Sequence, residues 1–240
     1  MKQSINLVKK SPGGAAARAA LLSLPFQTLG EEIANAILHG FGAILAVAGL
    51  VLLVLRGSGY LGAGPGSVAA AGAKTIVSYV IFTAAMLCMF LASTLYHAIQ
   101  HTGAKRVFRI LDHSAIYLFI AGSYTPYCLV GLQGAMGWAI VGAEWALAAA
   151  GITLHAVNYR PLKKLELVVY ILMGWAIVIA TVPLTRALSP LSLIFLAAGG
   201  AAYMLGVLFY RKRGTRGAHV TWHAFVLAGA ACHWLSVWWL

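Results

Sequence analysis

Long apolar runs separated by short polar connections make up most of this chain. Seven of the runs are long enough to cross about 30 Å of hydrocarbon as helices. They cover residues 33–55, 75–99, 108–131, 134–156, 165–186, 189–210 and 219–240. The runs are continuously apolar, which favours helices over the alternating strands of a membrane barrel. The pattern predicts an all-α integral membrane protein, a bundle of seven transmembrane helices over residues 31–240, preceded by a tail over residues 1–30.

The composition agrees with a membrane protein, and this class changes the interpretation of the net positive charge. The chain is 61% hydrophobic and only 9% charged, whereas about a quarter of the residues are charged in soluble domains. In a soluble protein, a net charge of +12 would suggest binding to nucleic acid. In a membrane protein the positions of the basic residues indicate the topology instead, and we expect no nucleic-acid partner. If the seven spans alternate in direction, all of the 17 Lys and Arg residues fall on one side except Arg56, Lys74 and Arg186. The positive-inside rule then places the N-terminus in the cytoplasm and the C-terminus outside.

Polar side chains able to carry chemistry gather near one predicted boundary, the cytoplasmic one. They are Glu32, Asn35, His39, Ser93, His97, Asp112, His219 and His223. Polar residues placed by chance would not all choose one end of the bundle. Ionisable groups are expensive inside a bilayer, so such a cluster indicates function.

Three of these histidines suit a zinc ion. His219 and His223 are one helical turn apart on one face at the start of the last run. His97 ends the second run. Three neutral imidazoles from two helices would hold zinc and leave a fourth position open. Glu32, Asn35 and His39, spaced along one helix face, are possible supporting residues.

Each residue also has a purely structural interpretation. His219 and His223 could be an interfacial pair near the headgroups, and His97 could satisfy the carbonyl end of its helix. Asp112, which we expect to open the third helix, could be a helix N-terminal charge or the partner of Arg109. Ser93 could bond its own backbone. His155, near a helix end, is expected at the interface. These alternatives stay open at the level of the sequence.

Four ordered motifs resemble the haemolysin III family of bacterial membrane proteins. The family is related to the progestin and adiponectin receptors and, more distantly, to the alkaline ceramidases. The motifs are Glu32-Ile-Ala-Asn35-x-x-x-His39, Ser93-x-x-x-His97, Leu111-Asp112-His113-Ser114-Ala115-Ile116-Tyr117 with Ala121-Gly122-Ser123-Tyr124-Thr125-Pro126, and His219-x-x-x-His223 with Ala230-x-Cys232-His233. The resemblance runs from about Leu29 to the C-terminus. It implies a multi-pass protein of the bacterial inner membrane, with seven helices and zinc on His97, His219 and His223. It further implies that Asp112 holds the zinc-bound water and that Ser93 lines the same cavity.

The resulting hypothesis is metal-dependent hydrolysis of a lipid amide or ester, similar to that of a ceramidase, at the cytoplasmic face. Asp112 would accept the proton of the water or orient the lone pair of the water towards a carbonyl, and Ser93 would donate to a developing oxyanion. Membrane lipids and a lipid-like substrate are the expected partners. Two other classes stay open, because a fold and a metal site do not by themselves establish turnover. One is a receptor-like or membrane-homeostasis protein with structural zinc. The other is a cytolytic pore, which the gathering of polar residues at one end disfavours.

The charge distribution makes the topology testable. Reporter fusions at Met1 and Leu240 should report opposite compartments, because an odd number of spans separates the two ends. A reporter inserted after Gln133, between the third and fourth runs, serves as an internal control and should report the outside. Fusions that place both ends in one compartment would mean an even number of spans and would scatter the polar motifs over both boundaries.

Overall fold

The computed structural model describes residues 27–62, 69–157, 160–212 and 215–240. Most of the predicted tail, residues 1–26, lies outside the described residues. Within the described part, seven helices are long and apolar enough to cross a membrane, which confirms the predicted seven-helix bundle. They cover Leu29–Gly57, Ala73–Ala98, Gly103–Leu132, Gly134–Ala156, Leu165–Ala187, Pro190–Tyr210 and Ala218–Trp238.

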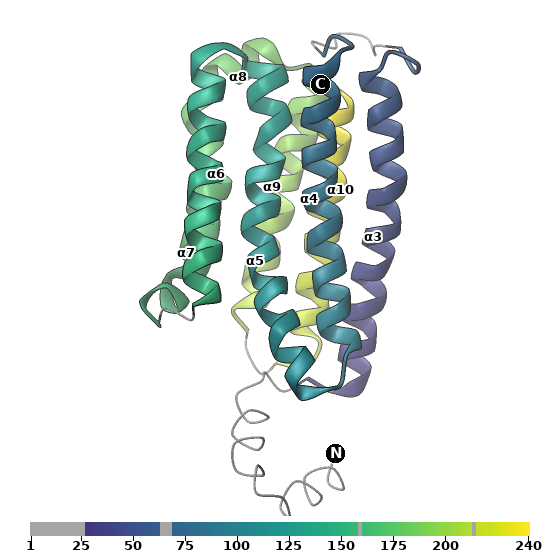
Figure 1. Ribbon diagram of the computed structural model, residues 1–240, viewed down its shortest axis with the longest axis vertical. Helices are drawn as coiled ribbons and strands as arrows, with labels where there is room; N and C mark the ends of the chain where they lie inside the picture. The colour runs from purple at the N-terminus through teal and green to yellow at the C-terminus, as the bar shows by residue number, and fades with distance from the viewer. Residues whose placement is uncertain (1–26, 63–68, 158–159, 213–214) are drawn as a thin grey trace, which may run out of the picture.

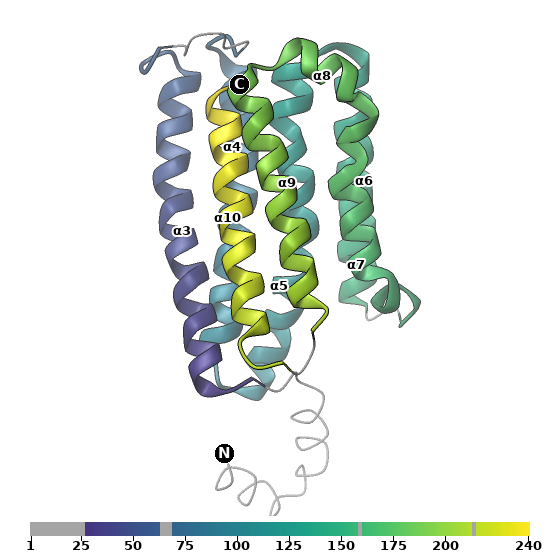
Figure 2. The ribbon, with the colours of Figure 1, turned by 180° about the vertical axis from the view of Figure 1, so that it is seen from behind.

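Successive spans run in alternating directions through short connections (Figure 1). Their regular elements are α3 (Leu29–Gly57), α4 (Ala73–Ala98), α5 (Thr102–Pro126), the π-helix η1 (Tyr127–Leu132), α6 (Gly134–Ala156), α7 (Arg160–Trp175), the 3-10 helix η2 (Ala176–Ala180), α8 (Thr181–Ala187), α9 (Pro190–Tyr210) and α10 (Ala218–Trp238). Helix α10 packs against both α3 and α9, and α4 packs against both α3 and α5 (Figure 2). We call the end of the bundle at which α3, α5, α7 and α10 begin the basic end, because most Lys and Arg residues of the described ranges fall there.

The third span begins earlier than the apolar run predicts. Helix α5 starts at Thr102, and the ring of His101 accepts a hydrogen bond from the Ala104 backbone N–H at 3.3 Å. Asp112 therefore lies well inside α5, and the expectation that it opens the helix is wrong. The first turns of α5 carry basic side chains. The apolar run therefore omits these turns and covers only the later, apolar part of the helix. Glu32 likewise lies in the first turn of α3 rather than just before it.

Two spans change helix type partway, and one tyrosine joins the two breaks. Pro126 cannot donate a backbone hydrogen bond, and α5 continues from it as η1. The fifth span breaks between α7 and α8. The Tyr124 hydroxyl donates to the Met173 carbonyl at 2.6 Å and accepts from the Ile177 N–H at 2.8 Å. Backbone groups freed inside a bilayer must be satisfied within the protein, so Tyr124 stabilises this break.

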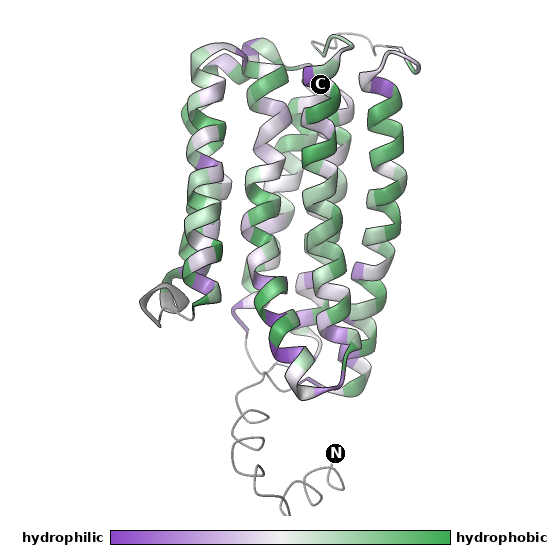
Figure 3. Ribbon diagram, in the orientation of Figure 1, coloured by the Kyte–Doolittle hydropathy of each residue, from purple (hydrophilic) through white to green (hydrophobic). Residues whose placement is uncertain are grey.

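Hydrophobic residues make up much of each span, and hydrophilic residues lie mainly near the ends of the helices, several of them at the basic end (Figure 3). Aromatic rings fill the space between neighbouring helices, with Tyr79, Phe82 and Phe90 of α4 almost fully buried. Close helix approach depends on small residues, as is common in membrane bundles. At Gly137 of α6, a methyl group would collide with the main-chain carbonyl oxygen of Cys128.

Gly137→Ala tests this close approach. The variant should lose about 1–3 kcal/mol of stability, the range for overpacking, because the obstacle is backbone rather than a flexible side chain. Thermal unfolding in detergent, followed by circular dichroism, measures the shift. Gly142→Ala is the matched control, since Gly142 lies on the same helix and an added methyl group meets nothing within 4 Å. Equal melting temperatures for the two variants would contradict the packing described here.

Candidate metal centre

Three histidines from two helices converge at the basic end. They are His97 at the end of α4, and His219 and His223 in the first turns of α10. One ring nitrogen of each lies within 4.8 Å of a ring nitrogen of each of the others. The Nε2 atoms of His219 and His223 are 2.8 Å apart. The structure therefore brings together the three residues that the spacing of the sequence selected, in a group able to hold a metal ion.

Glu32 fixes the orientation of His97. Its Oε2 atom lies 2.7 Å from Nδ1 of His97, and its Oε1 atom accepts a hydrogen bond from Nζ of Lys105 at 2.8 Å. If Nδ1 of His97 carries the proton and donates to this carboxylate, Nε2 has a lone pair that is free to bind a metal ion. That Nε2 atom is buried and has no hydrogen-bond partner among the described residues. A carboxylate behind a histidine is the usual support of a metal ligand, so the pair fits a metal centre.

His39 supports His223 in the same way. Nε2 of His39 lies 2.8 Å from Nδ1 of His223, and its ring meets the Phe90 ring edge-on at 5.1 Å. A nitrogen that binds a metal carries no proton. With Nε2 of His223 as the ligand, its Nδ1–H must donate to His39. Glu32 and His39, two possible supporting residues on one face of α3, therefore contact one metal-ligand candidate each.

The third supporting candidate and the two catalytic candidates lie around this group. The Asn35 amide nitrogen donates to Gln27 at 2.9 Å, and its carbonyl oxygen is buried without a partner among the described residues. The Ser93 hydroxyl is also buried, and no described residue forms an aligned hydrogen bond with it. The Asp112 carboxyl lies beside Ser93 and within electrostatic range of His97, but it is not a member of the three-histidine group. Three protein ligands with a carboxylate nearby is the composition of an open metal site.

Sequence reasoning missed two residues that position this centre. Lys105, counted only as a basic residue of a connection, is buried and pairs with Glu32. Glu31 caps the start of α3 with Thr28, and its Oε1 accepts a hydrogen bond from the Gly217 backbone N–H at 2.7 Å. Gly217 directly precedes α10 and has a φ of 76°. This contact sets the start of α10, and hence of His219, against the start of α3. No local sequence pattern predicts the contact between Lys105 and Glu32 or the contact between Glu31 and Gly217.

A groove of about 410 Å³ opens beside the centre, between α3 and the end of α4. Its lining is mostly apolar, with His97 and Gln100 at one side: Leu29, Ile33, Ala36, Ile37, His97, Ala98 and Gln100. Ile33 and Ile37 are at least half exposed. The groove therefore leads from an apolar outer surface of the bundle towards a residue of the metal centre.

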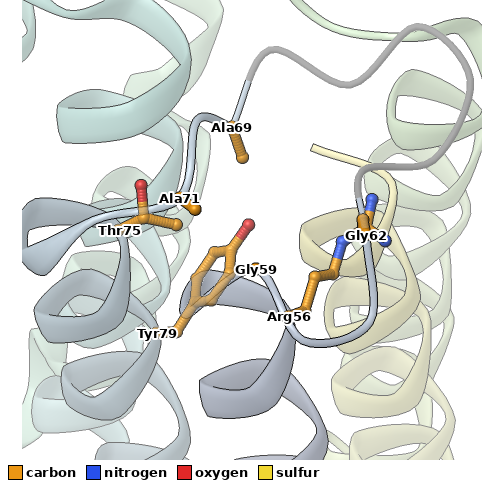
Figure 4. Close-up of a pocket in the computed structure, with 7 residues that line it drawn as sticks. All are labelled: Arg56, Gly59, Gly62, Ala69, Ala71, Thr75 and Tyr79. Atoms are coloured by element: carbon orange, nitrogen blue, oxygen red, sulfur yellow. Dashed lines mark hydrogen bonds between the residues drawn. The ribbon is translucent and has the colours of Figure 1, made fainter.

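A second hollow lies at the opposite end of the bundle and is much smaller. It has a volume of about 40 Å³ and is lined by Arg56, Thr75 and Tyr79 together with four small residues (Figure 4). That volume holds about one water molecule. It contains none of the predicted site residues, so we assign the chemistry to the basic end.

Comparison with known proteins agrees with the motifs. A family model described as "Haemolysin-III related" matches residues 27–234. The chain is 38% identical over 211 residues to "Hemolysin-3" of Bacillus cereus, covering 88% of this chain and 92% of the relative. It is 39% identical over 210 residues to "Hemolysin-3 homolog" of Bacillus subtilis (strain 168), covering 88% and 94%. It is also 32% identical over 170 residues to "Monocyte to macrophage differentiation factor" of Homo sapiens, covering 66% of this chain and 68% of the relative.

Metal content tests the three-histidine centre. Replacing His97, His219 and His223 by Ala should remove about one zinc equivalent per chain, because these three form the group of candidate ligands that the described residues bring together at that point. Glu32→Gln should keep the histidines but weaken zinc affinity by about 10- to 100-fold, as loss of a supporting carboxylate does. Mass spectrometry of protein purified through a histidine-free tag measures both effects.

His101→Ala is the control for general loss of a histidine, since His101 is exposed and lies outside the group. It should keep the zinc content of the parent protein. Unchanged zinc content in the triple variant would show that the three histidines hold no metal.

Proposed function

The chain belongs to the haemolysin III family of seven-helix membrane proteins, and from its three-histidine centre we propose that it is a zinc-dependent hydrolase of a lipid amide or ester. The single observation that carries the proposal is the make-up of the centre: three imidazoles converge, while Asp112 and Ser93 stand beside them outside the ligand group. A zinc ion bound by three protein ligands supplies a Lewis acid and a hydroxide nucleophile at neutral pH.

The side chains of the protein divide the remaining work. Asp112 accepts the proton of the attacking water as the water oxygen approaches the carbonyl carbon. Ser93 donates to the carbonyl oxygen as negative charge develops on it. When the carbon–nitrogen or carbon–oxygen bond breaks, the proton held by Asp112 passes to the leaving nitrogen or oxygen. The products are a carboxylic acid and an amine or alcohol.

The apolar groove supports a lipid-like substrate. It opens to the lipid side between α3 and α4 and borders His97. An acyl chain can enter such a groove laterally without leaving the hydrocarbon, and the carbonyl would then lie at the polar end beside the histidines. A water-soluble substrate would gain nothing from exposed Ile33 and Ile37 at the entrance.

A structural role for zinc, in a receptor-like or membrane-homeostasis protein, is the second candidate. A closed structural site takes four protein ligands, whereas the group here has three and excludes Asp112. This difference favours catalysis. The name "Hemolysin-3" of the Bacillus cereus relative suggests lysis, but a pore needs a polar path from end to end, and here the groups that carry chemistry gather at one end.

Asp112→Asn separates the catalytic role from the structural one. The amide keeps the shape of the side chain and its hydrogen-bonding capacity but cannot take the proton. Zinc content and melting temperature should change little, while hydrolysis of a responsive lipid amide or ester falls by about 10²-fold or more, as for loss of a general base. The assay follows release of the fatty acid from a panel of lipid amides and esters in mixed micelles.

Glu144→Gln is the matched control, because Glu144 is also an acidic residue within a span but does not belong to the three-histidine group. It should leave hydrolysis at the level of the parent protein. Loss of zinc together with activity in Asp112→Asn would make Asp112 a fourth ligand and favour the structural alternative. Full activity in Asp112→Asn would exclude its catalytic role.

A further inference from the structure

A second group of metal-ligand side chains joins α5 to α6 and α7. It consists of His113 of α5, His155 near the end of α6 and Glu166 of α7. One ligand atom of each lies within 4.8 Å of a ligand atom of each of the others. Asp112 and His113 are consecutive in the chain, so α5 presents one of them to the three-histidine centre and the other to this second group. His155 lies in the last turn of α6, and its side chain is buried against the other helices.

Both histidines lie within ion-pairing distance of Glu166, but their contacts with it are not aligned as hydrogen bonds. Nδ1 of His155 lies 2.7 Å from Oε1 of Glu166, and Nδ1 of His113 lies 3.5 Å from Oε2. Despite that short distance, Nδ1 of His155 is buried and has no aligned hydrogen-bond partner among the described residues. The two rings are stacked almost in parallel, with an interplanar angle of 8° and centroids 5.2 Å apart. Both Nδ1 atoms are therefore directed at one carboxylate, and neither forms a well-aligned hydrogen bond with it.

The carboxylate is held in place from outside the group. The Tyr170 hydroxyl lies 2.9 Å from Oε1 of Glu166 and 2.9 Å from the His113 carbonyl oxygen. Because the phenol has one proton, it can donate to only one of these oxygens at a time. The side chain of Glu166 is only 12% exposed and that of His155 only 8%, whereas that of His113 is 22% exposed. The group is thus mostly closed, with one edge reachable from the surface.

We propose that His113, His155 and Glu166 form a second site for a divalent transition-metal ion, with Zn²⁺ or Fe²⁺ as the fitting class. Two imidazoles and one carboxylate form an established ligand set for both ions, and it leaves positions open for water. Ligand atoms around a four-coordinate zinc ion are about 3.3 Å apart at bond lengths near 2 Å. The contact of 2.7 Å between His155 and Glu166 would therefore open slightly, whereas the contact of 3.5 Å between His113 and Glu166 is already close to that spacing. A cation at this point would take the buried Nδ1 lone pair of His155 and balance the charge of Glu166.

A metal ion at this site would link α5, α6 and α7, which pack against one another to different extents. Helices α5 and α6 pack closely, whereas α7 packs less extensively against either of them. Each helix supplies one ligand at the basic end, so bound metal would fasten α7 to the pair. Metal bound only by the folded bundle raises its stability by mass action.

Zinc stoichiometry tests the proposal with the full chain. All His, Cys, Asp and Glu residues of the chain lie within the described ranges. The protein is purified through a tag without histidine, so that the tag adds no imidazole ligand. Metal-free protein titrated with Zn²⁺ should take up about two equivalents per chain if both sites bind. His155→Ala and, separately, Glu166→Gln should each lose one equivalent. The variant lacking His97, His219 and His223 should keep the equivalent bound at His113, His155 and Glu166.

These variants distinguish the two sites from each other. If the three-histidine centre binds no metal, the wild type takes up one equivalent, and His155→Ala loses it while the triple variant keeps it. If only the three-histidine centre binds, the triple variant loses all zinc and His155→Ala behaves as the wild type. That second outcome would overturn the proposal and leave His113, His155 and Glu166 as a network of polar contacts.

Two further measurements distinguish loss of a zinc site from misfolding of a variant. The wild-type stoichiometry alone decides between one and two sites, and X-ray absorption of the zinc-loaded triple variant should show mixed nitrogen and oxygen ligands. Glu144→Gln, matched to Glu166→Gln as a buried carboxylate outside the group, should keep both equivalents. Circular dichroism identifies any variant that has lost its helices.

Discussion

A carboxylate inside a low-dielectric bundle must be both neutralised and hydrogen-bonded, and Glu32 satisfies this with groups from two other helices. It lies on α3 and contacts His97 of α4 and Lys105 of α5. Removing either partner would leave a buried charge, so the three helices are held in one relative position at the basic end. The orientation of His97, and with it the metal centre, depends on this contact.

The other elements complete the centre around this contact. Glu31, next to Glu32, bonds the backbone just before α10, which brings His219 and His223 towards His97. His39, two turns further along α3, orients His223. One face of α3 thus places ligands carried by two different helices, while another part of α3 lines the apolar groove. Support of the metal and access for a lipid chain arise from the same helix.

Helix α5 separates two groups that could hold metal. Successive residues of a helix point about 100° apart, so Asp112 and His113 can face two different groups from neighbouring positions on α5. The sequence motif Leu111-Asp112-His113-Ser114 therefore combines two assignments, one at the three-histidine centre and one at the group with His155 and Glu166. Such a division explains why both residues are polar at a depth where lipid-facing positions are apolar.

The sequence by itself determined the number of spans and their approximate bounds, because apolar length is a local property set by the thickness of the bilayer. It also selected His97, His219 and His223, since helical spacing and shared position at one boundary are readable along the chain. Only the tertiary structure decided which partner each ligand has: Lys105 with Glu32, His39 with His223, and His155 with Glu166. These contacts join residues distant in sequence, and their geometry depends on helix rotation and approach. Rotation and approach are fixed by packing between helices, which no local pattern encodes.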